Sequence, residues 1–496
     1  MNFFKSAPIH QRRYVQVFIA FAVLMGCKTL LANYPITPKA FSSNRFEMEI
    51  NGEPTFVYKF KDIHYAQFPH LVNSKIHIHL EIRRPFHSVE VGPRSVGIDP
   101  VVNVDSQEID FKLELPQKVV VTLDGKERLF IFPEQEEDSH PRGINILDYG
   151  ADPSGKTHST SAIQEAIDKA PKGSLVRIPP GHYLSGTLFL RSETTLWLDA
   201  GALLQASGNP AEFEQKQAAF IVVENAENVK LAGRGTIDGS GAFLRHLTGN
   251  SGRLLAIRDS QYVTIEDLIL RDPRSWNTQV LRSEHVTLRN LKLLHDRYVS
   301  NTDGIDPDSS RHILIEKNFF YCGDDAVAIK STNRNGRFED VYDIVVRDNI
   351  ILTKKSALKV GTESHASEMK DITFANNHVM ECDRGMALYA RDGTHMHSIR
   401  FIGNHFENNY PDYEQRLIHF RVQKRHGLSH ISNILIQDCT ANEYWPKPSL
   451  IRGLTNRNGI SDVRIVRLKI AGSYRDSADG AQLELGPYSR DVRFRN

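Results

Sequence analysis

A degenerate phrase recurs along the C-terminal two thirds of the chain and constrains its fold more than any other feature. It has two alternating apolar residues, then polar residues that often include Asn, then another apolar residue. The copies begin at Val229, Val263, Val286, Ile313, Ile344, Ile372, Ile399, Ile434 and Val463. Successive copies are 23 to 35 residues apart. This period indicates a solenoid, and the alternation indicates strands.

Each copy is best explained as one coil of a right-handed parallel β-helix, because the repeated pieces are strands and not helix pairs. A β-propeller, the alternative, would need four strands in about every 40 to 50 residues and a blade signature that we do not find. One helix is expected ahead of the repeats, where Ile163, Ala166, Ile167 and Ala170 lie at helical spacing behind Ser161 as N-cap. No other convincing helical pattern follows.

Residues 35–134 have a different pattern. Short alternating segments such as RFEMEI, HIHLEIR, IDFKLEL, VVVTLDG and RLFIFP are separated by turn dipeptides such as NG and DG. No helical period intervenes, which favours a small β-sandwich. The charged stretch at 134–143 is typical of a linker. We therefore predict an all-β protein with a β-sandwich accessory domain at 35–134 and a parallel β-helix domain at 143–496.

The first 32 residues have the features of an export signal. Lys5, Arg12 and Arg13 precede the apolar run YVQVFIAFAVLMGC, which is short for a membrane span but has the length of a signal-peptide core. LMGC resembles a bacterial lipobox, which would end the signal at residue 26 and place a lipid anchor on Cys27. The alternatives are a plain secretory signal cut near Ala32 and a retained anchor. We expect an exported protein: periplasmic, an outer-membrane lipoprotein or extracellular.

The composition excludes several classes of function. The chain has 61 Lys plus Arg against 60 Asp plus Glu, a balance that argues against a nucleic-acid or membrane-surface protein. Its four cysteines show no metal spacing and are too few for a disulfide scaffold. None of its 21 histidines shows a convincing zinc-ligand spacing. We expect a monomer with no cofactor and no metal.

Aspartates concentrate in NTDGIDPDSS at 301–310 and YCGDDAVAIKS at 321–331. Asp303 precedes Asp324 by 21 residues and Asp325 by 22, close to one coil. Equivalent strands of successive coils stack about 4.8 Å apart, so the three carboxylates are expected to converge. Asp324 and Asp325 can share one side only if the backbone turns, and Gly323 supplies the expected bend.

Such crowding favours chemistry over a structural role. Like charges resist joint ionisation and raise the pKa of at least one carboxyl. Glycoside hydrolysis uses such a difference in pKa between neighbouring carboxyls, because it needs a protonated acid beside an ionised base or nucleophile. The alternatives are solvated turn residues and a cation bound among the carboxylates, although the spacing excludes a DxDxDG calcium loop. Asp306 is expected to support the site and Asp308 to be a turn residue.

The same residues carry a family resemblance. NTDGID followed by GDDAVAIKS resembles the signature of the polygalacturonase-type glycoside hydrolases, family 28, of the pectin-lyase-like β-helix superfamily. DYGADPSGKTHSTSAIQEAI, VRIPPGHYLSGTLFLRS, GRGTIDGSG and RDPRSWNTQ extend the resemblance over about residues 143 to 470. It implies hydrolysis with inversion and makes the β-helix the catalytic domain. By this resemblance Asp324 is the general acid, Asp303 and Asp325 position and deprotonate the water, and Asn301 contacts substrate.

The chain departs from the family where a uronate would be bound. Members that cut polygalacturonic acid usually continue with Gly-His-Gly and then Arg-Ile-Lys, whereas Ser356 replaces the histidine and Ala387 and Tyr389 replace the arginine and lysine. The nearby cations that are candidates to replace them are Lys355, Lys359, Arg384 and Arg391. The expected substrate is galacturonan. The alternatives are rhamnogalacturonan, a sulfated algal galactan, a polysaccharide lyase reaction, or a non-catalytic carbohydrate-binding role.

Three further residues are candidates for contact with a polysaccharide. Lys330 would either hold an anionic group or pair with one of the aspartates. Trp276 would either stack on a sugar ring or lie in the core. Tyr389 would face the sugar, and Arg384 and Arg391 complete the predicted substrate-binding set.

Overall fold

The computed structural model describes residues 41–70, 74–135, 142–213, 219–249 and 252–495. The chain divides into two compact units, Met1–Val91 with Ile98–Ser139, and Gly92–Gly97 with His140–Asn496. The expected signal at 1–32, with Cys27, and the junction near residue 140 lie outside the described residues, so the export signal and the domain limits stay predictions. No helix in the described part is long and apolar enough to cross a membrane.

Two five-stranded sheets over one apolar core form the first unit, which is a β-sandwich as predicted. Met48 and Ile78 of one sheet share a buried cluster with Val121 and Ile131 of the other. The first sheet runs β2 (Glu53–Thr55), β1 (Phe46–Ile50), β5 (Ile76–Ile82), β8 (Glu108–Leu113), β7 (Val101–Asn103). The second runs β3 (Tyr58–Phe60), β4 (Ile63–His70), β10 (Glu127–Gln135), β9 (Val119–Leu123), β6 (Val89–Gly92).

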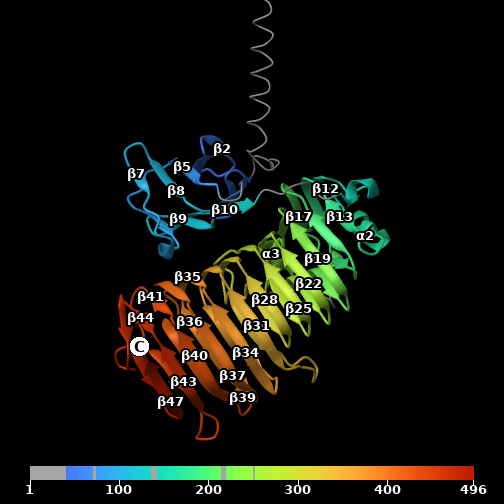
Figure 1. The fold of residues 1–496 in the computed structure, drawn as a ribbon. Coiled ribbons are helices and arrows are strands. Elements are labelled where there is room, and N and C mark those ends of the chain that lie inside the picture. Colours follow the sequence, from blue (N-terminus) through green and yellow to red (C-terminus); the bar gives the residue numbers. More distant parts are fainter. Residues whose placement is uncertain (1–40, 71–73, 136–141, 214–218, 250–251, 496) are drawn as a thin grey trace, which may run out of the picture. The chain divides into compact units, whose positions relative to one another are not determined.

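Three long sheets, here called sheets I, II and III, form the second unit, and most coils give one strand to each. Figure 1 shows the strands stacked from β13 to β47. Sheet I runs β11 (Ile144–Asn145), β13 (Leu175–Ile178), β16 (Thr195–Leu198), β19 (Glu227–Gly233), β22 (Gln261–Glu266), β25 (Glu284–Arg289), β28 (Arg311–Glu316), β31 (Val341–Arg347), β34 (Glu368–Ala375), β37 (His395–Ile402), β40 (His430–Gln437), β43 (Ile460–Val466), β47 (Ser489–Arg495).

Sheet II runs β12 (Ser154–His158), β14 (Gly181–Ser185), β17 (Ala202–Ala206), β20 (Thr236–Asp238), β23 (Ile269–Arg271), β26 (Lys292–Leu294), β29 (Phe319–Cys322), β32 (Ile350–Thr353), β35 (His378–Cys382), β38 (His405–Asn409), β41 (Thr440–Ala441), β44 (Leu468–Ile470), β45 (Ser473–Arg475). Sheet III runs β15 (Leu188–Leu190), β18 (Ala219–Glu224), β21 (Arg253–Arg258), β24 (Thr278–Leu281), β27 (Ile305–Asp308), β30 (Val327–Ser331), β33 (Ser356–Ser364), β36 (Arg384–Asp392), β39 (Arg416–Gly427), β42 (Ser449–Arg452), β46 (Leu483–Leu485). Neighbouring strands are parallel except β44 and β45.

The residues that begin the repeated phrase stack in one column of sheet I. Val229 pairs with Val263 and Val263 with Val286, and the same register continues to Val463. Every member of the column is buried in the apolar core between the sheets. The sequence period is therefore the coil of the solenoid, and the predicted right-handed parallel β-helix is confirmed.

A ladder of buried asparagines follows the strands of sheet I. Asn318, Asn349, Asn377 and Asn404 each stand two residues beyond β28, β31, β34 and β37. The side-chain Nδ2 of each of the first three donates to Oδ1 of the next asparagine, at 3.0, 2.8 and 2.9 Å, and also to a backbone carbonyl of the preceding coil. The ladder satisfies polar groups inside the turn and joins four consecutive coils.

The helices differ in part from expectation. The predicted helix is α2 (Thr160–Lys169), with Ile163, Ala166 and Ile167 buried as expected. Its N-cap residue is Ser159 and not Ser161. A second helix, α3 (Gly241–Thr248), was not predicted, because its short segment follows a turn and begins with glycine. The described residues also contain the 3₁₀ helices η2 (Arg94–Val96), η3 (Ile146–Tyr149) and η4 (Pro210–Glu212).

We predict that Asn349→Leu lowers the free energy of unfolding by about 2 to 4 kcal/mol, because it leaves a buried backbone N–H and the Asn318 amide without their acceptor. Chemical unfolding followed by circular dichroism measures the change. Asn333→Ala, at an exposed asparagine in the loop after β30, is the matched control and should change the free energy by less than about 0.5 kcal/mol. Equal effects of the two substitutions would contradict a role for the ladder.

Candidate active site

The three predicted acids lie at one corner of the β-helix, where the chain passes from sheet II to sheet III. Asp303 precedes β27, and Asp324 and Asp325 precede β30 on the next coil. The backbone N–H of Gly304 donates to the carbonyl of Asp325 at 2.9 Å, which holds the two coils in register at this corner. The structure thus brings the three residues together, one coil apart.

Two glycines leave the room that this corner needs. A Cβ at Gly304 would lie 2.4 Å from the carbonyl oxygen of Ala326, and one at Gly323 would lie 2.4 Å from that of Val299. Both distances are too short for any side chain. Residues 323–326 stand outside the strands, between β29 and β30. The side chains of Asp324 and Asp325 therefore need not point to opposite faces, as successive side chains of a strand do.

Asp324 is held by backbone groups and is partly protonated near neutral pH. Its Oδ2 accepts from the N–H of Asn301 and its Oδ1 from the N–H of Asp325, both at 2.9 Å. Burial raises the pKa of Asp324 to about 6, and the charges of Asp303 and Asp325 act in the same direction. The Asn301 N–H opposes this rise only in part.

Asp325 stays ionised although it is more deeply buried. Burial acts to raise its pKa, but Lys359 and then Arg384 outweigh burial and hold the pKa well below its usual range. Lys359 Nζ lies 2.5 Å from Oδ2, and a guanidinium nitrogen of Arg384 lies 3.8 Å from Oδ1. The N–H of Ser356 also donates to Oδ1, at 2.8 Å. Adjacent carboxyls thus differ strongly in proton affinity.

Lys330 pairs with aspartates, which is one of its two predicted roles. Its Nζ lies 2.8 Å from Asp303 Oδ2 and 2.9 Å from Asp306 Oδ1. The side chain is 4% exposed, and the two carboxylates raise its pKa against the effect of burial. Trp276 packs on it, with Nζ 3.5 Å from the ring centroid, and Arg253 lies 4.1 Å from the same centroid. Trp276 therefore contacts two cations at the acid corner.

The remaining predicted residues fall into two groups. Tyr389 is 7% exposed, and its hydroxyl shares a 2.7 Å hydrogen bond with Nδ1 of His419, so it lies beside Arg384 as a buried neighbour of the acids. Asn301 is exposed and reaches Asp324 through its backbone. Arg391 lies at the opposite end of β36 from Arg384. The structure does not bring Arg391 to the acids.

Among the candidate replacement cations, Lys359 and Arg384 reach the acids, whereas Lys355 pairs with Asp412 at 2.5 Å. Asp306 and Asp308 are both fully buried. Asp306 supports the site through Lys330, as expected. Asp308 lies in β27 and accepts from Gln279 at 2.9 Å, so the expectation of a turn residue was wrong.

Arg253 is a residue of this corner that the sequence analysis missed. It acts electrostatically on Asp306 and Asp303 as well as contacting Trp276. Arg253 precedes Trp276 by 23 residues, which is again one coil. The coil spacing that places the aspartates together also predicts that Arg253 lies beside Trp276. A lone arginine outside any motif, however, is not recognisable as a site residue from the sequence.

Fold and site together define the class of protein: a parallel β-helix with three carboxylates and buried lysines at one corner. Residues 170–390 match the model of Glycosyl hydrolases family 28. The chain is thus similar to this family over that part of the β-helix, which agrees with the resemblance of its sequence motifs.

Two similar proteins are named as enzymes that act on galacturonan. "Exo-poly-alpha-D-galacturonosidase" of Dickeya chrysanthemi is 25% identical over 313 residues, which are 50% of this chain and 52% of that protein. "Endo-polygalacturonase" of Pectobacterium carotovorum subsp. carotovorum is 27% identical over 278 residues, 45% of this chain and 69% of that protein. This chain spans about half the length of the first relative.

A solved structure shows the same fold. The hyperthermoactive exopolygalacturonase from Thermotoga maritima superposes with a TM-score of 0.58 at 21% sequence identity. The match covers 68% of this chain and 88% of that one. At this identity the likeness concerns the fold.

Proposed function

We propose that this protein is an inverting glycoside hydrolase that cleaves an anionic polysaccharide, with galacturonan as the first candidate. One observation carries the proposal: Asp324 has a pKa of about 6, while its neighbour Asp325 is held ionised by Lys359. A protonated acid beside an ionised base is the pair that glycoside hydrolysis requires. The family match over residues 170–390 and the relatives named as polygalacturonases support the same reaction.

In the proposed reaction, Asp324 donates its proton to the glycosidic oxygen as the bond from that oxygen to the anomeric carbon breaks. A water molecule held by Asp303 and Asp325 attacks the anomeric carbon from the opposite side. One of these carboxylates accepts the proton that the water loses. Lys330 and Lys359 position Asp303 and Asp325 through ion pairs, and Lys359 keeps Asp325 ionised.

We propose that Lys359 and Arg384 also make the site selective for an anionic sugar. Lys359 pairs in register with Ala387, which stands where related enzymes carry an arginine. The positive charge that Ala387 lacks is thus supplied by Lys359, which stands at the paired position on the preceding coil. A charge-assisted contact of this kind is strong for a carboxylate, and Arg384 can form it with two parallel hydrogen bonds.

Rhamnogalacturonan is the second candidate substrate. One observation that favours it is that Ala387 and Tyr389 stand where polygalacturonases usually carry an arginine and a lysine. The other is a relative named "Probable rhamnogalacturonase B" of Neosartorya fischeri, which is 24% identical over 254 residues. These residues are 50% of this chain and 46% of that protein. Incubation with polygalacturonate and rhamnogalacturonan in parallel, with products resolved by size, distinguishes the two. Cleavage of only the second would overturn galacturonan as the substrate.

We predict that Asp324→Asn lowers kcat on the cleaved polysaccharide by about 10³-fold, because general acid catalysis contributes roughly 10² to 10⁴. Reducing-end release measures the rate. Asp462→Asn is the control: this carboxylate is half exposed, lies in β43 and has a positive φ that Asn tolerates, so the rate of this variant should equal that of the unchanged protein. Full activity of Asp324→Asn would rule out the acid assignment, and an unsaturated, ultraviolet-absorbing product would indicate a lyase.

The pH dependence of the reaction follows from the same pKa. The acid must be protonated, so kcat/KM should fall about tenfold per pH unit above the Asp324 pKa of about 6. A pH series with the soluble polysaccharide measures this limb. A rate that stays constant from pH 6 to about pH 9 would show that another group donates the proton.

We propose further that the chain is exported and carries a lipid on Cys27, and that it acts as a monomer. The apolar run before Cys27 and the lipobox-like LMGC support export and the lipid anchor. Labelling of cells with a radioactive fatty acid should mark the full-length protein but not Cys27→Ser. Equal labelling of both, or of neither, would overturn the lipid anchor.

A further inference from the structure

Three groups of histidine and acidic side chains lie outside the acid corner in the described part of the β-helix. They are Glu284, His285 and His312; His365, Asp392 and His426; and Glu368, His395 and His397. Within each group the candidate ligand atoms lie within 4.8 Å of one another. What else each side chain contacts decides which group can hold a metal ion.

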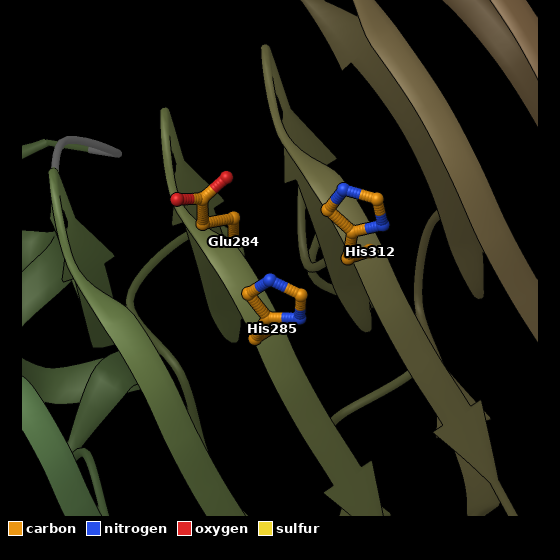
Figure 2. Close-up of side chains that lie close together, drawn as sticks. All are labelled: Glu284, His285 and His312. Carbon is orange, nitrogen blue, oxygen red and sulfur yellow. The ribbon is translucent and has the colours of Figure 1, made fainter.

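The first group is a stacking ladder. Figure 2 shows Glu284 and His285 on β25 and His312 on β28. The two imidazoles are stacked 4.7 Å apart and 5° from parallel, and Tyr262 stacks on His285 at 4.8 Å. Parallel rings direct their nitrogen lone pairs side by side and not toward a shared ion. His312 Nδ1 also shares a 2.7 Å hydrogen bond with Asp343.

The second group has a carboxylate that is already neutralised. Arg425 contacts both oxygens of Asp392, at 2.8 and 2.5 Å, and the N–H of Ser364 donates to one of them. A guanidinium does not lose its proton in proteins, so its positive charge stays at this position. It opposes the binding of a cation by Asp392.

The third group crosses successive coils of sheet I on its outer face. Glu368 begins β34 and pairs in register with His395, the first residue of β37. His395 pairs in turn with His430, the first residue of β40. His397 lies two residues after His395 and on the same face, whereas Met396 between them is buried in the core.

Serine hydroxyls orient the two central imidazoles. His395 Nε2 lies 2.8 Å from Ser432 Oγ, and His397 Nδ1 lies 3.1 Å from Ser398 Oγ. His395 Nδ1 is therefore the nitrogen that would bind a metal ion. His397 Nε2, the other candidate ligand atom, lies 3.5 Å from Glu368 Oε1. In metal sites the second nitrogen of a histidine ligand is held by just such an outer hydrogen bond.

We propose that Glu368, His395 and His397 bind a divalent transition-metal ion, with Zn²⁺ as the first candidate. Imidazole and carboxylate ligands suit this class of ion better than Ca²⁺ or Mg²⁺. Bonds of about 2.0 to 2.2 Å to Zn²⁺ place tetrahedral ligand atoms roughly 3.4 Å apart, so the present spacing must close by at most about 1.4 Å.

His430 is the candidate fourth ligand. Its ring centroid lies 4.9 Å from that of His395. Its Nδ1 is buried and has no hydrogen-bond partner within the described ranges. A modest ring movement would turn this nitrogen into a ligand and would satisfy it.

Arg490 acts on His430 and opposes an ion there, whereas Lys370 opposes the ion by contact with the proposed ligand Glu368. Its ammonium pairs with Glu368 Oε2, while Glu368 Oε1 faces His397. Asp340 and Asp371 also attract Lys370, so acidic charge predominates around it. Removing the charge of Lys370 should therefore tighten metal binding. Surface histidines that bind metal without Glu368 would not show this effect.

The ion would join β34, β37 and β40 and stabilise three successive coils. Its site lies where strands of sheet I begin, whereas the acids precede strands of sheet III. The proposal is thus independent of the proposed hydrolase reaction, and activity should not require the ion.

The test uses the full chain, purified without a histidine tag and freed of metal with a chelator. Co²⁺ titration should give one saturable equivalent with the strong visible absorption of a four-coordinate site, and Zn²⁺ should compete with it and raise Tm. The double variant His395→Gln/His397→Gln should lose at least about 100-fold in affinity. The matched variant His285→Gln/His312→Gln should bind as the unchanged protein does, and Lys370→Gln should bind more tightly.

Absence of saturable Co²⁺ binding, or equal affinity in the His395→Gln/His397→Gln variant and the unchanged protein, would overturn the proposal. Circular dichroism reports whether that variant folds. If it does not, Glu368→Gln takes its place, with an expected loss of at least tenfold and with unchanged affinity as the overturning result.

Discussion

The in-register parallel stacking of coils is the constraint on which the rest of this molecule depends. It places the same position of each coil in a column, so the apolar column that includes Val229 and Val263 becomes core, and buried asparagines become a hydrogen-bonded ladder. The same register makes neighbours of Asp303 and Asp325, which are 22 residues apart in sequence. Core, ladder and acid site are three results of one geometric rule.

Charge pairing decides what the acid corner can do. Buried carboxylates without partners would be neutral or strongly destabilising. Lys330 and Lys359 supply partners for Asp303 and Asp325, whereas Asp324 is held by two backbone N–H groups and carries no ion pair among the described residues. The arrangement therefore separates Asp325, which stays ionised, from Asp324, which takes up a proton near neutral pH. This asymmetry supports a division into base and acid.

The sequence predicted the solenoid and the convergence of the acids because both depend on spacing along the chain. It could not choose among Lys355, Lys359 and Arg391, since side-chain direction at the ends of strands depends on bends that spacing does not encode. Asp308 was assigned to a turn because Asp is common there, whereas the structure buries it in a strand. The histidine group escaped notice because Glu368, His395 and His430 are separated by whole coils of 27 and 35 residues.

Neighbouring carboxyls at the acid corner are expected to have very different proton affinities. Carbon-13 NMR of protein labelled at the aspartate carboxyls, with Asp324→Asn and Asp325→Asn used for assignment, measures this directly. Asp324 should titrate near pH 6, and Asp325 should stay ionised to well below pH 4. Joint titration of both carboxyls near the ordinary value of about 4 would contradict this separation of proton affinities.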